Sequence, residues 1–262
     1  MIDRCFTLTI WLTAGIVFLA FGWLISEVVV QGVGKLSWTF LTDEPTRSGR
    51  EGGIYPIIVS TLLILGTALV IVIPIGLGSA IWLAEFTKKS SKRVQSTRLI
   101  LDVLAGVPSI VFGLFGYAFF CGFLGLGFSI LSGGLTLACM MLPILIRTTE
   151  AGLTSVPNDW RRAGAALGVS RTTLLRQVLL PYASPAITAG LLLSIGRATA
   201  ETAALIFTSG YVDRMPESLN DSGRALAVHI YDLSMNVVGG DKAAYGSALV
   251  LIIMVVIINL SA

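Results

Sequence analysis

The feature that most constrains the fold of this chain is a series of long apolar runs. A helix needs about 20 apolar residues to cross a hydrocarbon layer about 30 Å thick, and the runs have about that length. With 55% hydrophobic and 13% charged residues and a mean hydropathy of +0.85, the chain lacks the charge that a soluble surface requires. The sequence predicts an all-α polytopic membrane protein with six transmembrane helices: Thr7–Val30, Tyr55–Leu83, Leu99–Phe123, Ser129–Ile146, Ala183–Phe207 and Tyr245–Leu260.

Basic residues orient these spans, because cytoplasmic loops carry an excess of Lys and Arg. The segments after the second and fourth spans are basic, whereas residues 31–53 and 208–244 are balanced or acidic. The basic residues are Lys88, Lys89, Lys92, Arg93 and Arg98 after the second span, and Arg147, Arg161, Arg162, Arg171 and Arg176 after the fourth. We therefore expect a multi-pass plasma-membrane protein with both termini in the cytoplasm, and a short tail beyond Ala262.

The chain divides into an N-terminal helix with its extracytoplasmic segment (1–54) and a five-helix transmembrane domain (55–262). The external segment 208–244 contains turn residues and a weak helical pattern over Ala225–Tyr231, which predicts a small structured cap. Pro108 and Ser109 interrupt the third span, as either a packing kink or a break that exposes backbone to a pore.

The polar loop 147–182 has the local chemistry of a helix–turn–helix element. Helix formers over Trp160–Leu167 predict a first helix that exposes Arg161 and Arg162, with Ala163, Ala166 and Leu167 on its apolar side. Gly168 suits a left-handed stop, and Ser170 can cap a second helix that ends at Pro181. Two other interpretations are an amphipathic helix on anionic membrane lipid and a DNA-binding motif. The flanking spans leave no independent domain for the second, so we expect no nucleic-acid partner.

This loop resembles the "EAA" motif of bacterial ABC-importer permeases: Glu-Ala-Ala, three residues, Gly, nine residues, then Ile-x-Leu-Pro. Here Arg162-Ala163-Gly164 takes the triplet, Gly168 the glycine, and Val178-Leu179-Leu180-Pro181 the end. The resemblance implies that the element docks on a cytoplasmic ATPase. The docking residues would be Arg161, Arg162, Ala163, Gly164, Gly168, Leu180 and Pro181. Arg162 replaces an acidic residue and Gly164 an alanine, so an ion pair of the family at Arg162 does not carry over.

Further stretches resemble PstA-type permease subunits of phosphate ABC importers, from about Glu51 to Tyr231. They are Glu51-Gly-Gly-Ile-Tyr-Pro56, Ile81-Trp-Leu-Ala-Glu-Phe86, Leu104-Ala-Gly-Val-Pro-Ser-Ile-Val-Phe-Gly113, Gly196-Arg-Ala-Thr-Ala-Glu-Thr202 and Arg224-Ala-Leu-Ala-Val-His-Ile-Tyr231. The resemblance implies the type I (MetI-like) permease fold and a bacterial inner membrane. It also implies a PstC-type second permease, two copies of a PstB-type ATPase and a PstS-type extracytoplasmic phosphate-binding protein.

Two charged residues lie deep in the fifth span. Arg197 and Glu201 each cost about 2.5–3.5 kcal/mol at mid-bilayer on insertion scales, so both should face the bundle interior or water. They are one helical turn apart and can form an ion pair. The alternatives are a structural salt bridge and an anion path in which Arg197 attracts phosphate and Glu201 tunes or gates passage; the resemblance favours the path.

Several chemistries lack the residues that they need. The chain has no phosphate-binding P-loop, so ATP hydrolysis must belong to a separate subunit. His229 is the only histidine and fits an ordinary polar loop residue, so we expect no catalytic residues, metal or cofactor. The alternatives are a permease of the same class for another oxyanion or small solute, a structural membrane scaffold and, with least support, an intramembrane enzyme.

Overall fold

The computed structural model describes residues 2–88 and 90–261 of the chain. Met1, Lys89 and Ala262 lie outside this description, as do the side chains of residues 2–5 and 8. The described residues form helices joined by loops, of which the one between Ile206 and Leu226 is long, with one two-stranded hairpin. The helices are α1 (Ile2–Val33), α2 (Trp38–Thr42), α3 (Tyr55–Glu85), α4 (Lys92–Ala105), α5 (Ser109–Gly116), η1 (Tyr117–Phe123), α6 (Ile130–Ser155), α7 (Asn158–Ala166), α8 (Arg171–Leu174), η2 (Leu175–Leu179), α9 (Leu180–Thr199), α10 (Ala203–Ile206), α11 (Leu226–Met235) and α12 (Asp241–Leu260).

Each predicted membrane span has a counterpart among the candidate spans, but the third differs in shape and others differ in where the helix ends. Within the described residues, five helices are long and apolar enough to cross a bilayer, and a sixth span is present if α4 and the following α5–η1 segment are counted together. That pair is bent by 100°. The straight third span expected from the sequence is therefore wrong. The bend falls at Gly106–Pro108, where proline provides no backbone N–H to continue the helix.

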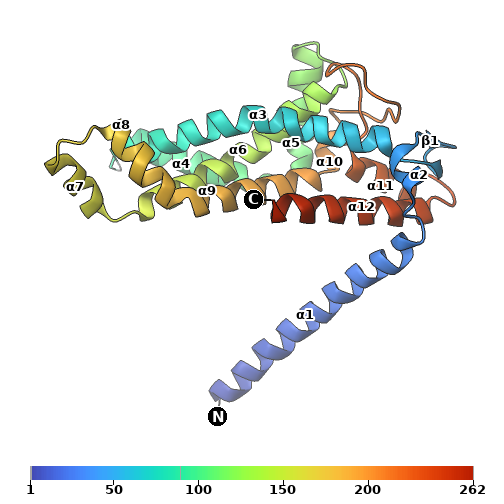
Figure 1. Cartoon of the computed structure of the whole chain (residues 1–262), viewed down its shortest axis with the longest axis horizontal. Helices are drawn as coiled ribbons and strands as arrows, with labels where there is room; N and C mark the ends of the chain where they lie inside the picture. The colour runs from blue at the N-terminus through green and yellow to red at the C-terminus, as the bar shows by residue number, and fades with distance from the viewer. Residues whose placement is uncertain (1, 89, 262) are drawn as a thin grey trace.

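The bundle is built around α6, which packs between α3 and α9 (Figure 1). Leu137, Met141 and Leu145 of α6 are almost completely buried and join Ile64 and Val72 of α3 in the main core cluster. Without a hydrophobic force between helices in lipid, close packing of small residues holds such helices together. Glycines of α6 and α9 allow this approach, as at Gly152 and Gly190.

Helix α1 stands apart from the bundle and meets it only near its C-terminal end, where it packs on α12 (Figure 1). Its most apolar stretch is 0% buried, and Phe18 and Trp23 are 79% and 74% exposed. This surface suits a lipid or protein environment.

One end of the bundle carries α7 and α8, and the opposite end carries α2, the hairpin and α11 (Figure 1). The hairpin pairs β1 (Pro45–Thr46) antiparallel with β2 (Glu51–Gly52), in the register Pro45↔Gly52 and Thr46↔Glu51. It has no counterpart in the sequence expectations. The predicted cap is present as α11, and a cluster that includes Phe40, Ile54, Leu226 and Val250 ties this end together.

Two predicted helix ends in the loop and fifth span are wrong. The second loop helix does not stop at Pro181: residues Arg171–Thr199 form one candidate span, with the wider π turn η2 just before the proline. A π turn relaxes the backbone where proline removes a hydrogen bond. The fifth span does not reach Phe207, because α9 ends at Thr199 and a short break precedes α10. In addition, α6 continues through Arg147 to Ser155, which shortens the polar loop.

Candidate functional site

The loop element is held by local capping, as its sequence predicts. Gly168 adopts a left-handed conformation with φ of 68°. Its N–H donates to Ala165 O at 3.2 Å and the N–H of Val169 donates to Gly164 O at 3.0 Å, the hydrogen-bond pair of a Schellman stop. Ser170 Oγ then accepts from the N–H of Thr173 at 3.1 Å and caps α8. Both ends of the turn are therefore fixed by short-range bonds.

Gly164 makes the close packing of the two loop helices possible. It is buried, and a Cβ at this position would lie 3.0 Å from Leu174 Cδ1 of α8. The alanine expected from the family pattern is thus replaced by a glycine where α7 and α8 meet. At the other side of the element, Trp160 packs edge-on against Tyr182 with ring centroids 5.1 Å apart.

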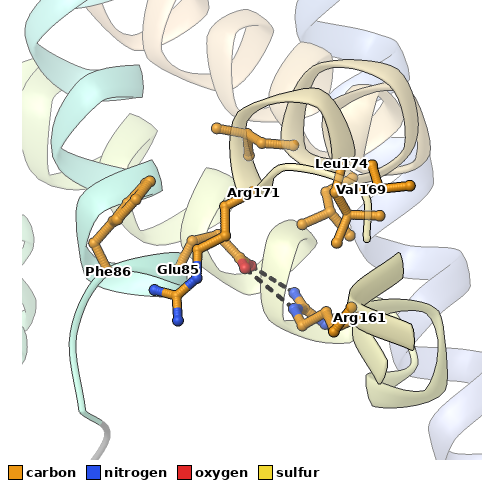
Figure 2. Close-up of a pocket in the computed structure, with 9 residues that line it drawn as sticks. Glu85, Phe86, Arg161, Val169, Arg171 and Leu174 are labelled. Atoms are coloured by element: carbon orange, nitrogen blue, oxygen red, sulfur yellow. Dashed lines mark hydrogen bonds and ion pairs between the residues drawn. The ribbon is translucent and has the colours of Figure 1, made fainter. Parts of the chain in front are cut away.

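Arg161 points into the protein rather than out to solvent, which corrects the sequence expectation. Its Nη2 and Nε lie 2.6 Å and 3.2 Å from the two carboxylate oxygens of Glu85 at the end of α3 (Figure 2). The same guanidinium donates to Val156 O and Leu153 O, both at 2.8 Å, at the end of α6. The Arg161 and Glu85 side chains are only 24% and 15% exposed. We call this arrangement the Arg161 clamp.

The remaining predicted docking residues divide between the surface and the interior. Arg162 is 82% exposed, with Asp159 3.7 Å away, and Ala163, Gly168 and Pro181 are also exposed. Leu180 is half-buried against the cluster that contains Leu179. Leu167, expected on the packed apolar side of α7, is 80% exposed, because Gly164 rather than Leu167 faces α8.

A cavity of about 310 Å³ lies between the end of α3 and the loop helices. Its lining includes the Arg161–Glu85 pair, with Phe86 and Arg171 near Glu85 and with Val169 and Leu174 on the loop helices' side (Figure 2). The cavity lining therefore combines charged and apolar side chains.

Arg197 and Glu201 do not lie on one continuous helix. Arg197 is half-buried in the last turn of α9 and donates from Nη1 to Ala105 O, at the end of α4, at 3.4 Å. Glu201 is 8% exposed and lies in the break, where its carboxylate accepts from Ala204 N–H at 3.2 Å and so caps α10. The described residues show no ion pair between the two, because the α9–α10 break separates them.

The two helix breaks of the bundle lie side by side. A Cβ added to Gly113 of α5 would lie 2.8 Å from Ala204 Cα of α10, so these two segments touch backbone to backbone. Arg197, just before the second break, also bonds to Ala105 O, just before the first. The structure confirms that Pro108 interrupts the third span, with a 100° bend, and both sequence interpretations of this interruption, a packing kink and backbone exposed to a pore, stay predictions. Broken helices at membrane depth are tolerated where they are buried or line a water-filled path.

A four-membered charge cluster joins α4 to α6. Glu150 accepts from Arg98 Nε at 2.6 Å and from Arg147 Nη1 at 2.8 Å, and Arg147 Nε reaches Asp102 at 2.7 Å. These residues line an open polar cavity of about 630 Å³. The sequence analysis places Arg147 and Glu150 in the polar loop 147–182 and does not predict their pairing with each other or with α4. The spacing of three between Arg147 and Glu150 was the available signal.

A second polar cluster lies at the opposite end, around α11. Arg224 donates to Tyr211 O at 2.7 Å and pairs with Asp232 at 3.2 Å. His229 is 0% exposed on α11, so the expectation of a loop residue is wrong. Burial, followed by the nearby charge of Arg224, lowers the pKa of His229 to about 3 despite the opposing effect of Asp232. This histidine is a neutral core residue. The described residues contain no cluster with the composition of a metal site.

Known proteins resemble this chain in sequence over most of its length. It is 34% identical over 254 residues to the "Probable ABC transporter permease protein YqgI" of Bacillus subtilis (strain 168), with 91% of this chain and 86% of that protein covered. It is 35% identical over 246 residues to the "Phosphate transport system permease protein PstA 1" of Mycobacterium tuberculosis (strain CDC 1551 / Oshkosh), covering 92% and 80%. For the PstA protein of Haemophilus influenzae the identity is 30% over 239 residues, covering 91% and 84%.

Solved structures share the fold at low sequence identity. A chain of the inward-facing MetNI methionine ABC transporter matches with a TM-score of 0.60 and 17% identity, over 80% of this chain and 90% of that chain. A bacterial ABC transporter for the acidic polysaccharide alginate matches with a TM-score of 0.65 and 14% identity, over 96% and 94%. The predicted all-α permease fold is confirmed.

A family model described as "Binding-protein-dependent transport system inner membrane component" matches residues 72–262, more than half of the chain. The expectation of a transport component rather than an enzyme is confirmed by this match and by the permease relatives. The chain therefore belongs to the family of binding-protein-dependent transport system inner membrane components.

Proposed function

We propose that this chain is the PstA-type permease subunit of a bacterial ATP-driven phosphate importer. The observation that carries the proposal is the position of Arg197, a half-buried guanidinium at the junction of the two helix breaks. Within the described residues its guanidinium makes one hydrogen bond, to Ala105 O at 3.4 Å, so most of its donors remain available to an anion. The relatives named as phosphate permeases support phosphate as that anion.

The anion path runs between this chain and a PstC-type permease, past Arg197. Glu201 sets the local charge there, since its carboxylate is buried beside α10. A planar guanidinium with several donors suits the oxygens of phosphate. Glu201 and Arg197 thus form the substrate path in this proposal.

The end with α7 and α8 is cytoplasmic, as are both termini. Two copies of a PstB-type ATPase engage the loops of the two permeases, and one of them docks on the loop of this chain. The excess of arginine on this loop supports the orientation. The α11 end is external and receives a PstS-type phosphate-binding protein. Movement of the ATPases upon ATP binding shifts α7 and switches access to the path.

Phosphate uptake into vesicles tests this proposal. The chain is reconstituted with its three partner proteins, and uptake of radiolabelled inorganic phosphate is driven by internal ATP. We expect ATP-dependent uptake that unlabelled phosphate suppresses and that sulfate and molybdate leave intact. Selective uptake of sulfate or molybdate would instead support the second candidate, a permease for another oxyanion. Failure of the chain to co-purify with any ATPase would reject the importer altogether.

A further inference from the structure

We propose that the Arg161 clamp transmits movement of the docking helix α7 to the membrane helices α3 and α6. This inference rests on the proposed function, because it assumes that α7 engages an ATPase. It assigns Arg161 a positioning role inside the permease in place of a contact with the partner.

The clamp joins three helices through one side chain. Arg161 belongs to α7, Glu85 is the last residue of α3, and Leu153 and Val156 lie at the end of α6. The guanidinium makes two bonds to the Glu85 carboxylate and one to each of the two carbonyls. Its planar fork fixes these directions together, which a flexible ammonium would not do.

Electrostatics favour a cation at this position. The last carbonyls of a helix have no partner within the helix, and the helix dipole makes that end negative. Both α3 and α6 end next to Arg161, and the Glu85 carboxylate adds a full negative charge. Because both side chains are largely shielded from solvent, separating them leaves poorly solvated charges, so the contact resists stretching.

Arg162, the next residue in α7, is exposed where Arg161 is largely shielded from solvent. Arg162 is 82% exposed, and α7 otherwise packs on α8 through Gly164 and on α9 through the Trp160–Tyr182 ring contact. A force on the exposed face of α7 thus reaches α8 and α9 through side-chain packing, and α3 and α6 through Arg161. Loss of the clamp would leave α7 attached on one side only.

The experiment uses the reconstituted complex with Arg161→Gln, Glu85→Gln and Arg161→Lys. Two quantities are measured: the phosphate imported per ATP hydrolysed, and the stimulation of ATP hydrolysis by the binding protein. We expect Arg161→Gln to co-purify with the ATPase and to lower both by about tenfold, within the usual range for coupling between sites. Glu85→Gln should have a smaller effect, because the carbonyl bonds remain, and Arg161→Lys should lie between wild type and Arg161→Gln.

Arg93→Gln is the matched control. Arg93 is exposed in α4, and within the described part of the chain its side chain has no hydrogen bond or ion pair. It should retain wild-type coupling.

An assembled Arg161→Gln complex with wild-type coupling would overturn the inference. If the Arg161→Gln complex does not assemble, Glu85→Gln decides. The inference is then overturned if Glu85→Gln couples normally or also fails to assemble, because the pair would serve only to stabilise the fold. If the wild-type complex shows stimulated ATP hydrolysis but no phosphate uptake, the proposed substrate is wrong, and the stimulation ratio still decides the role of the clamp.

Discussion

The close crossing of α6 and α9 makes a sharp prediction at Gly190. A Cβ at this position would lie 2.9 Å from Thr148 Cβ and would also collide with the Thr148 hydroxyl. That hydroxyl already donates to Ile144 O at 2.9 Å and Leu145 O at 3.1 Å, so rotating it away sacrifices bonds in a half-buried site. Gly190→Ala should therefore destabilise the bundle, although alanine is the better helix former.

The expected loss of stability in Gly190→Ala can be estimated from these distances. Carbon atoms pack best about 3.5–4.0 Å apart, so the helices must separate by about 1 Å. Overpacking of this kind costs about 1–3 kcal/mol, and exchanging glycine for alanine in a helix returns about 1 kcal/mol. We expect a net loss of up to about 2 kcal/mol in the free energy of unfolding, which leaves Gly190→Ala about 1–3 kcal/mol below a glycine-to-alanine exchange without a clash.

Reversible unfolding in mixed detergent–SDS micelles measures this difference. Gly196→Ala is the control, because Gly196 lies in the same helix with no atom within 4 Å of its built Cβ. It should be unchanged or stabilised by up to about 1 kcal/mol. Adding Thr148→Gly to Gly190→Ala should recover the steric part of the loss. Equal stability of Gly190→Ala and Gly196→Ala would refute close packing at this crossing.

Three further outcomes are expected. Arg197→Ala should abolish most ATP-driven phosphate uptake in vesicles while assembly stays normal, because the path loses its cation; unchanged uptake would remove Arg197 from the path. Arg162→Glu should leave uptake per ATP within about twofold of wild type, since an exposed ion pair is worth only about 0–1 kcal/mol; a large loss would make this charge a docking determinant. The unfolded state binds a proton at His229 near pH 6.5 whereas the folded state does so only near pH 3. Stability should therefore fall by about 1.4 kcal/mol per pH unit below 6.5, and a His229→Gln variant with the same slope in the unfolding titration would contradict this.

The sequence predicted best those features that depend on residues a few positions apart in the chain. The spans follow from hydropathy, and the stop at Gly168 and the cap at Ser170 follow from backbone chemistry within a few positions. These predictions needed no knowledge of the rest of the fold.

Contacts between distant segments were not readable in the same way. Arg161 and Glu85 are 76 residues apart, and nothing local distinguishes the paired Arg161 from the exposed Arg162. The close approach of Gly113 to Ala204 of α10 is likewise a contact between distant segments. An apolar proline-containing run has the same composition whether it is straight or bent by 100°.

The Schellman stop at Gly168 and the Ser170 cap affect how tightly a partner protein can bind α7. Because α7 and its turn are ordered by their own bonds, a protein that binds them meets a surface that already has its final shape. Ordering a flexible backbone would cost about 1–2 kcal/mol per residue, and the nine residues of α7 avoid that cost at the moment of binding. A small contact area can then give a stable complex, because little of its interaction energy is spent on conformational entropy.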